Sequence, residues 1–170
     1  MNIHWSATDF FEKLTEKNKL AHDYGFKFCR VSGLNGFEEA VSRLQNTKAF
    51  VCVSDVSQGK TSMDNTPHMG KVKTIFLAMR HPANDMQRRN VCMDTMHELF
   101  RQFMTVLIME KIRLQEQCIY IDERIQFNEI DQYFLSGCAA AYFQINVQKY
   151  IDLRYNPNEW KSDSDFPGNP

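Results

Sequence analysis

The residues that could carry nucleophilic or acid–base chemistry are few and lie apart along the chain. Cys92 and His97 are the nearest pair of a nucleophile and a base, and His81 precedes them. Positions five apart on a helix point to different faces, so Cys92 and His97 cannot meet through local geometry. A histidine beside an apolar stripe is usually a packing residue, and we therefore expect no enzyme activity from this pair.

A cluster of carboxylates in the segment "IDERIQFNEID" could suggest metal binding or acid–base work. No histidine and no glycine-rich loop accompanies it, and its members fall at expected strand ends and turns, where acidic residues aid solubility. We expect a solvated face rather than a metal site. The four residues are Asp122, Glu123, Glu129 and Asp131.

The stretch "SQGKT", residues 57–61, ends in Gly-Lys-Thr as phosphate-binding loops do. The first glycine of such a loop would fall at Ser54, and the residues that follow have turn chemistry rather than the start of a helix. We therefore expect no nucleotide site in this stretch and no cofactor anywhere in the chain.

The cysteines are odd in number and widely separated, with no C-x-x-C pair and no spacing typical of metal ligands. They sit in apolar patterns, where a free cysteine acts as a small buried hydrophobe. This predicts reduced, metal-free thiols in a reducing compartment. The five are Cys29, Cys52, Cys92, Cys118 and Cys138.

Composition favours one domain, residues 1–160, followed by a polar tail over residues 161–170. The 170 residues are 43% hydrophobic, enough for a real core, and 20 basic against 21 acidic residues leave a net charge of −1. The N-terminus lacks the pattern of a signal peptide, and no apolar run approaches the roughly 18 residues of a membrane span. We expect a soluble cytosolic protein without a membrane partner.

The elements that must position these residues are clearest near the end of the sequence. Residues 136–157 carry three alanines near their start, yet apolar residues occupy the odd positions and polar residues the even ones. Lys149 is the exception on the odd side. A period of two predicts a long half-buried strand of about 15 residues, although the alanines could instead mark where a helix lies close to the sheet.

Earlier elements follow from helical and strand periodicity. We expect a helix from the N-cap Ser6 to about His22, a strand in 25–32, a helix in 37–45, strands in 49–56 and 71–81 joined by a polar hairpin tip, a long helix capped by Asn84 and running to about Gln117, and a strand in 118–131 interrupted near Asp122. The order predicts an α+β fold, a mainly antiparallel sheet with the long helix and the shorter helices packed on one side.

The overlong last strand, a long helix apolar on two sides, a polar hairpin tip and a loose tail indicate a subunit that assembles. From Met104 to Met109 the long helix is apolar almost all round, which predicts burial on two sides, and Met104, Ile108 and the tail residue Trp160 form a candidate assembly surface. The hairpin segment, residues 57–73, is locally basic although the whole chain is near neutral. Its candidate residues are Lys60, His68, Lys71 and Lys73.

The second half of the chain resembles phage and prophage tail-terminator or tail-completion proteins, particularly versions of Bacteroides type. The resemblance rests on "HPANDMQRRNVCMDTMHELFRQFMTVL", an amphipathic strand segment and "GCAAAYFQINVQKYIDLRYNPNEW", and covers residues 75–160. It implies a non-catalytic α+β subunit of the virion, assembled in the host cytoplasm into a ring, commonly a hexamer, that terminates the tail tube and joins it to the head. Its partners would be tail-tube and head-connector proteins.

Other readings of the same features remain open. The basic hairpin can be a solvated tip, a ring lining with non-specific DNA contact, or an interface with a neighbouring subunit. The whole chain can instead be an accessory oligomeric module of a secretion or conjugation machine. A small enzyme is a third reading, for which the sequence discloses no pocket.

Overall fold

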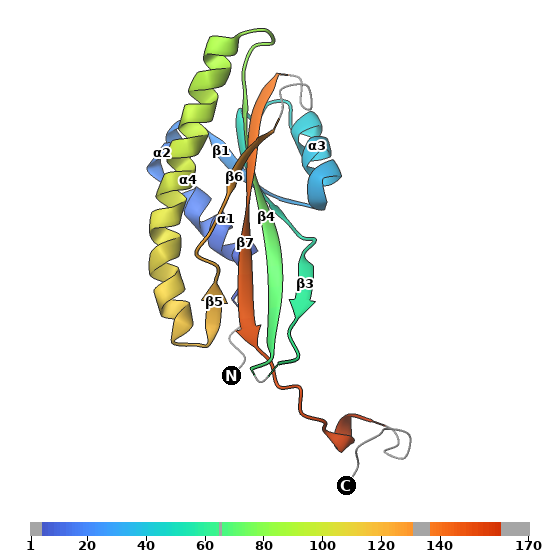
Figure 1. Cartoon of the computed structure of the whole chain (residues 1–170). Helices are drawn as coiled ribbons and strands as arrows, with labels where there is room; N and C mark the ends of the chain where they lie inside the picture. Colours follow the sequence, from blue (N-terminus) through green and yellow to red (C-terminus); the bar gives the residue numbers. More distant parts are fainter. Residues whose placement is uncertain (1–4, 65, 131–136, 161–170) are drawn as a thin grey trace.

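The computed structural model describes residues 5–64, 66–130 and 137–160. Helices and strands follow one another in an elongated body around one sheet (Figure 1). The order is α1 Ala7–Lys17, α2 Lys19–Asp23, β1 Phe26–Val31, α3 Gly33–Arg43, β2 Ala49–Ser54, β3 Gln58–Thr61, β4 His68–Arg80, α4 Met86–Gln115, β5 Ile119–Ile121, β6 Phe127–Ile130, β7 Cys138–Tyr150 and the short 3₁₀ helix η1 Pro157–Glu159.

The seven described strands form a single mixed sheet in the order β1-β2-β4-β7-β5, with β3 paired to β4 and β6 paired to β7. The fold is α+β, as predicted, but the sheet is mixed rather than mainly antiparallel. β1 and β2 run parallel because α3 carries the chain back across the sheet between them. The strand expected over 118–131 is two short strands, β5 and β6, which pair with different parts of β7.

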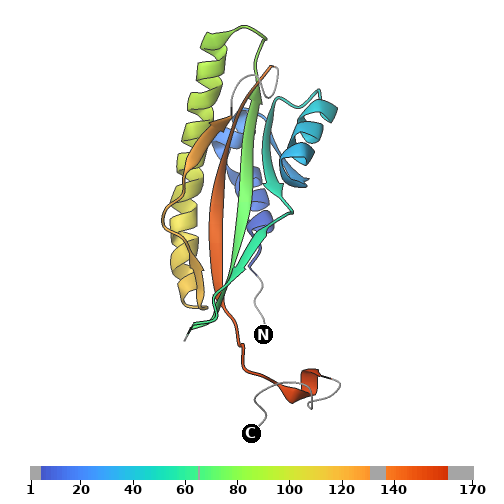
Figure 2. The ribbon, with the colours of Figure 1, turned by 45° about the vertical axis from the view of Figure 1, so that its right-hand side comes forward.

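The helices cover both faces of the sheet, which corrects the prediction that they pack on one side. α1, α2 and α4 lie on one face and α3 lies on the other (Figures 1 and 2). Each face has its own buried cluster. Phe11 and Phe103 belong to the larger one, beneath α1 and α4, and Phe37 stacks on Phe76 in the smaller one, beneath α3. The β1-α3-β2 crossover places α3 opposite the other helices.

The alanine run of β7 lies between these two helical layers. Ala139 and Ala141 face the α4 cluster, whereas Ala140 faces the α3 cluster, and all three are buried. This half of β7 is therefore buried on both faces. The predicted alternation holds only further along, where Phe143 and Ile145 are buried and Gln144 is exposed.

Aromatic rings join the helices to the last strand inside the larger cluster. Phe11 of α1 lies 5.9 Å from Phe103 of α4 and 5.6 Å from Phe143 of β7, measured between ring centroids. Phe100 of α4 lies 5.0 Å from Phe143 on its other side. Such edge-to-face and tilted pairs add to the stability gained from burial. They fix the angle at which α1 and α4 cross the sheet.

The ends of the helices agree in part with prediction. The Ser6 side chain caps α1 by accepting a hydrogen bond from the Asp9 N–H, as expected. The helix stops at Lys17 rather than near His22, because the Asn18 side chain accepts from the Ala21 N–H and starts α2. The cap of α4 is Asp85, which accepts from the Arg88 N–H, and not the neighbouring Asn84.

The last residue of β4, Arg80, fastens the C-terminal end of α3. Its guanidinium donates to the carbonyl oxygens of Val41, Leu44 and Thr47 and lies 5.6 Å from the centroid of the Phe50 ring. The terminal carbonyls of a helix lack partners within the helix, and a cation stabilises their negative dipole end. Arg80 therefore attaches the α3 layer to the central strands.

Replacing Ala141 with leucine tests whether the alanines are dictated by the helical layers. Overpacking a fully buried site costs about 1–3 kcal/mol, and we expect that loss in the free energy of unfolding measured with urea. The control is Gln148→Leu on the opposite face of the same strand, beyond α3, which should change stability by about 0.5 kcal/mol or less. Equal effects of the two substitutions would contradict the two-layer packing.

Candidate functional site

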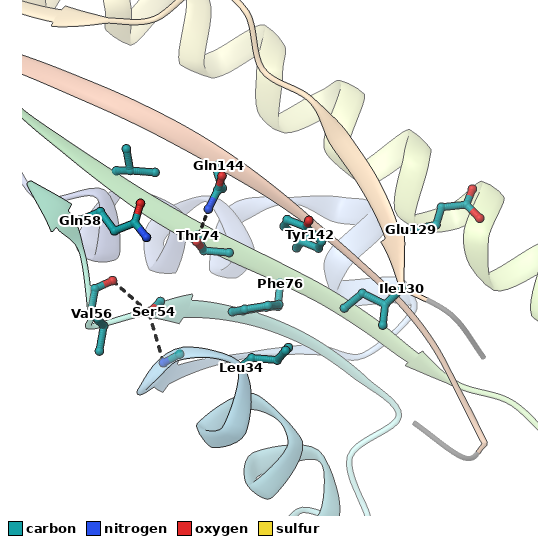
Figure 3. Close-up of a pocket in the computed structure, with 12 residues that line it drawn as sticks. Leu34, Ser54, Val56, Gln58, Thr74, Phe76, Glu129, Ile130, Tyr142 and Gln144 are labelled. Carbon is teal, nitrogen blue, oxygen red and sulfur yellow. Dashed lines mark hydrogen bonds between the residues drawn. The ribbon is translucent and has the colours of Figure 1, made fainter. Parts of the chain in front are cut away.

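A groove of about 500 Å³ opens on the α3 face of the sheet, beyond the N-terminal end of α3. Phe76 and Tyr142 form much of its floor, and Leu34 and Ile130 face each other across it (Figure 3). Thr74 accepts a hydrogen bond of 3.0 Å from the Gln144 amide at the same floor. The groove suits an apolar ligand or segment with a few polar groups.

The residues lining this groove offer little for catalysis. Glu129 belongs to its rim but points away from it, toward α4 (Figure 3), where its carboxylate lies 3.3 Å from His97. The Ser54 hydroxyl is occupied, since it accepts from the Gly33 N–H and donates to the Val56 carbonyl. Among the described lining residues no nucleophile faces a base, so we find no basis for covalent catalysis in this groove.

The predicted basic hairpin forms, but its four residues do not act as one site. β3 pairs with β4 inside the stretch predicted as the tip, and this hairpin lies beyond α3 toward the end of the sheet from which β7 leads to residue 151 (Figure 1). Alternation along the strands puts Lys60 and His68 on the α3 face and Lys71 and Lys73 on the α4 face. His68 also packs edge-on against Tyr120 and Tyr150. The four residues therefore do not share one face of the hairpin.

On the α4 face, Lys71 and Lys73 join a lysine that sequence reasoning did not include among the candidates. Lys149 of β7 lines the same pocket of about 620 Å³, together with Trp5 and the N-terminal end of α1. Lys149 was visible as the one charged residue among the apolar odd positions of the last strand. A charged residue at an otherwise apolar position of the strand was therefore the feature of the sequence that indicated this pocket.

The two α4 residues predicted to form an assembly surface, Met104 and Ile108, differ in exposure. Met104 is half-buried against the core and belongs mainly to the inner side. Ile108, by contrast, is 59% exposed, and Met109 and Ile112, which the prediction did not name, are 70% and 59% exposed. We call Ile108, Met109 and Ile112 the outer stripe. The predicted burial on two sides is thus realised on one side only within this chain.

The third predicted assembly residue, Trp160, lies at the far end of an arm, residues 151–160. The arm leaves β7 and runs away from the body of the molecule (Figures 1 and 2). Leu153, Tyr155 and Trp160 are each about half exposed, and the Tyr155 and Trp160 rings stack 6.4 Å apart. The tail beyond, residues 161–170, lies outside the described residues.

The other chemical candidates resolve as structural groups. Cys92 is buried and its thiol faces the Arg80 carbonyl, whereas His97 is packed against Phe127, so the two point to different partners. "SQGKT" contributes the edge strand β3 and not a phosphate-binding loop.

The carboxylates expected to form a solvated face are separately placed. Glu123 pairs with Lys111 on α4, and Glu129 pairs with His97. Asp131 lies outside the described residues. Within the described ranges, no group of three or more histidine, cysteine or carboxylate side chains is arranged to hold a metal ion.

Comparison with models of known protein families and with curated proteins finds no match. Among the described residues, the helices are too short or too polar to cross a membrane. The function must therefore be argued from the surfaces of the molecule itself.

The five cysteines carry free thiols, but their environments differ. Cys52 is buried as predicted, while Cys118 is exposed, contrary to the expectation of buried cysteines. Cys29 is partly exposed and lies directly opposite Cys52 in the parallel pair of β1 and β2. A hydrogen bond from the Cys52 thiol lowers the pKa of Cys29 to about 7, against the opposing effect of burial.

Cys29 should therefore be the thiol that reacts at neutral pH. We expect its alkylation by iodoacetamide to rise with a midpoint near pH 7, because the thiolate is the nucleophile and its pKa is about 7. Cys52→Ala removes the hydrogen-bond donor and should raise the midpoint toward the ordinary value, whereas Cys52→Ser keeps a donor and should preserve much of the shift. Mass spectrometry of digests follows Cys29, with Cys118 as internal reference. An unchanged midpoint in Cys52→Ala would refute the hydrogen bond as the cause.

Proposed function

We propose that this protein is a non-catalytic structural subunit that assembles with copies of itself into a ring. The outer stripe of α4 carries the proposal. Ile108, Met109 and Ile112 form a contiguous apolar patch at helical spacing on the side away from the core, and each is more than half exposed. Three neighbouring large apolar side chains in water are unfavourable, and contact with another subunit would remove them from solvent.

The arm supplies a second, different apolar surface. Leu153, Tyr155 and Trp160 are about half exposed on a segment that leads away from the body. Six residues, 151–156, precede η1 in the arm, and an extended segment of that length reaches about 20 Å, which is enough to cross a neighbouring helix about 10–12 Å wide. We propose that the arm of one subunit lies over the outer stripe of the next.

A contact between two different surfaces has a consequence for symmetry. When the arm of each copy binds the stripe of the next, the contact is heterologous, and it repeats until a ring closes or a filament grows. A dimer with two-fold symmetry would instead use the same patch on both subunits. The separate stripe and arm favour the ring.

The role we propose for this ring is that of a phage or prophage tail terminator, which ends the tail tube and joins it to the head. Support comes from the resemblance of residues 75–160 to that group, which includes the segment of α4 that bears the stripe and the strand and arm that follow. Tail-tube and head-connector proteins are the partners proposed, with assembly in the host cytoplasm. Nothing in the role requires a cofactor or a catalytic residue.

The oligomeric state of the purified chain tests the proposal. Light scattering should give a mass several times 20.0 kDa, alone or once tail-tube protein is added. Met109→Glu with Ile112→Glu should reduce that mass to the monomer, because two carboxylates would have to be buried in the contact. Val91→Glu is the matched control, since Val91 is 56% exposed on the same helix but lies outside the stripe. A chain that stays monomeric under all these conditions would refute the proposal.

Mixing two variants tests the heterologous contact itself. Met109→Glu/Ile112→Glu keeps the arm intact, whereas Leu153→Ser/Trp160→Ser keeps the stripe intact. Each should be monomeric alone, and the mixture should give a one-to-one complex near twice 20.0 kDa, because one arm and one stripe remain. A mixture that stays monomeric, while both variants keep the native circular dichroism spectrum, would exclude the arm-to-stripe contact.

A further inference from the structure

The pocket of about 620 Å³ on the α4 face gathers positive charge that the described structure does not neutralise. Lys71, Lys73 and Lys149 line it. In the register of β4 and β7, Lys149 stands opposite Met69, so it is the diagonal neighbour of Lys71 on the same face. Like charges at such spacing repel one another, which favours an anion between them.

The Lys73 side chain is held in place by two backbone carbonyl groups. Its ammonium group donates hydrogen bonds of 3.1 and 2.9 Å to the carbonyl oxygens of Ser54 and Asp55. An ammonium group has three N–H donors, so one donor remains. Within the described part of the chain, none of the three pocket lysines forms an ion pair with a carboxylate at 4.0 Å or less.

The acidic residue that lines the pocket does not balance the lysines. Asp152 is bound at 2.6 Å by the Arg154 guanidinium, and this hydrogen-bonded ion pair lowers the pKa of the carboxyl to about 2. Its charge is therefore already matched by an arginine. The excess positive charge of the three lysines stays in the pocket.

The N-terminal end of α1 opens into the same pocket. Ser6, Ala7 and Thr8 line it. Because the Ser6 side chain already caps the Asp9 N–H, the N–H groups of Ala7 and Thr8 are those of the first turn that the helix leaves without an internal partner. A helix N-terminus adds partial positive charge and donors to the ammonium groups.

The remaining wall is apolar and includes an aromatic ring. Trp5 is fixed by a hydrogen bond of 2.9 Å from its indole N–H to Glu110 of α4, and Ile119 and Val147 line the pocket beside it. The ligand should therefore have an apolar or planar part as well as an anionic group. Three ammonium groups and two backbone N–H groups offer more donors than the two oxygens of one carboxylate can use, whereas a phosphate presents three oxygens and close to two charges.

We propose that this pocket binds a nucleotide, with its phosphate between Lys71, Lys73, Lys149 and the N-terminus of α1 and its base against Trp5. The volume falls in the range of small-molecule sites. A free mononucleotide and a nucleotide within single-stranded nucleic acid present the same chemistry to these residues. The pocket includes Ile151 and Asp152, the first two residues of the arm, but neither the outer stripe nor the Leu153 and Trp160 side chains, so the substitutions that test the ring leave the lysines of this site unchanged.

Fluorescence of Trp5 provides a local test. The chain has two tryptophans, so Trp160→Phe leaves Trp5 as the reporter inside the pocket. In this background AMP should change the emission in a saturable manner, inorganic phosphate should compete, and adenosine should bind far more weakly because it lacks the phosphate. A thymidine decanucleotide, added in a separate titration, distinguishes a polymer from a free nucleotide, and saturable binding of either one supports the site.

Lysine variants decide whether the binding belongs to this pocket. Lys149→Gln and Lys71→Gln should each weaken binding roughly tenfold, as expected for loss of a charge-assisted hydrogen bond. Lys60→Gln is the matched control, because Lys60 lies in the same hairpin but on the opposite face. Native thermal unfolding of each variant excludes misfolding. The proposal is overturned if neither AMP nor the decanucleotide changes the Trp5 emission in a saturable manner, or if Lys60→Gln weakens binding as much as Lys149→Gln. It is also overturned if a glutamate peptide, added as a test of an acidic protein ligand, changes the emission in a saturable manner while neither nucleotide does.

Discussion

The antiparallel pairing of β4 with β7 is the constraint on which the rest of the fold depends. The two strands pair over their full 13 residues, from His68 opposite Tyr150 to Arg80 opposite Cys138. Every other strand except β1 attaches directly to one of them, and β1 attaches through β2. Because side chains alternate along both strands, this one register decides which residues face α4 and which face α3.

The same pairing has a buried part, between the helices of the two faces, and a part with exposed lysines nearer the ends His68 and Tyr150. Where β4 and β7 lie between the helical layers, both faces are buried and small residues such as Ala140 and Ala141 allow close approach. Beyond α3 the two strands continue with β3 beside β4, and the alternation of side chains displays different chemistry on each face. Lys71 and Lys149 lie toward α1, whereas Lys60 and His68 lie toward the opposite surface. One structural element thus builds both the core and the surfaces proposed for binding.

Sequence periodicity predicted the elements well because their signals are local. The long helix, the last strand, the Ser6 cap and the hairpin all follow from patterns within a few residues. The side on which α3 packs could not be predicted in this way, since it depends on the parallel crossover between β1 and β2. The sequence predicted the basic residues of the hairpin as one group, but the opposite parity of Lys60 and Lys71 in the paired strands puts them on different faces. The position of Lys149 beside Lys71 depends on the register between β4 and β7, which the sequence alone does not give.

The position of β7 in the sheet has a consequence for folding during synthesis. β7 lies between β4 and β5, near the centre of the sheet, yet it is the last strand of the described chain to leave the ribosome. Until then the apolar half of β4, around Ile75 and Leu77, presents a backbone edge without its partner while α4, β5 and β6 are being made. An unpaired apolar edge is a template for association with other chains. For the time that translation takes to supply β7, the stability of the β4 edge therefore rests on β2 and β3 alone.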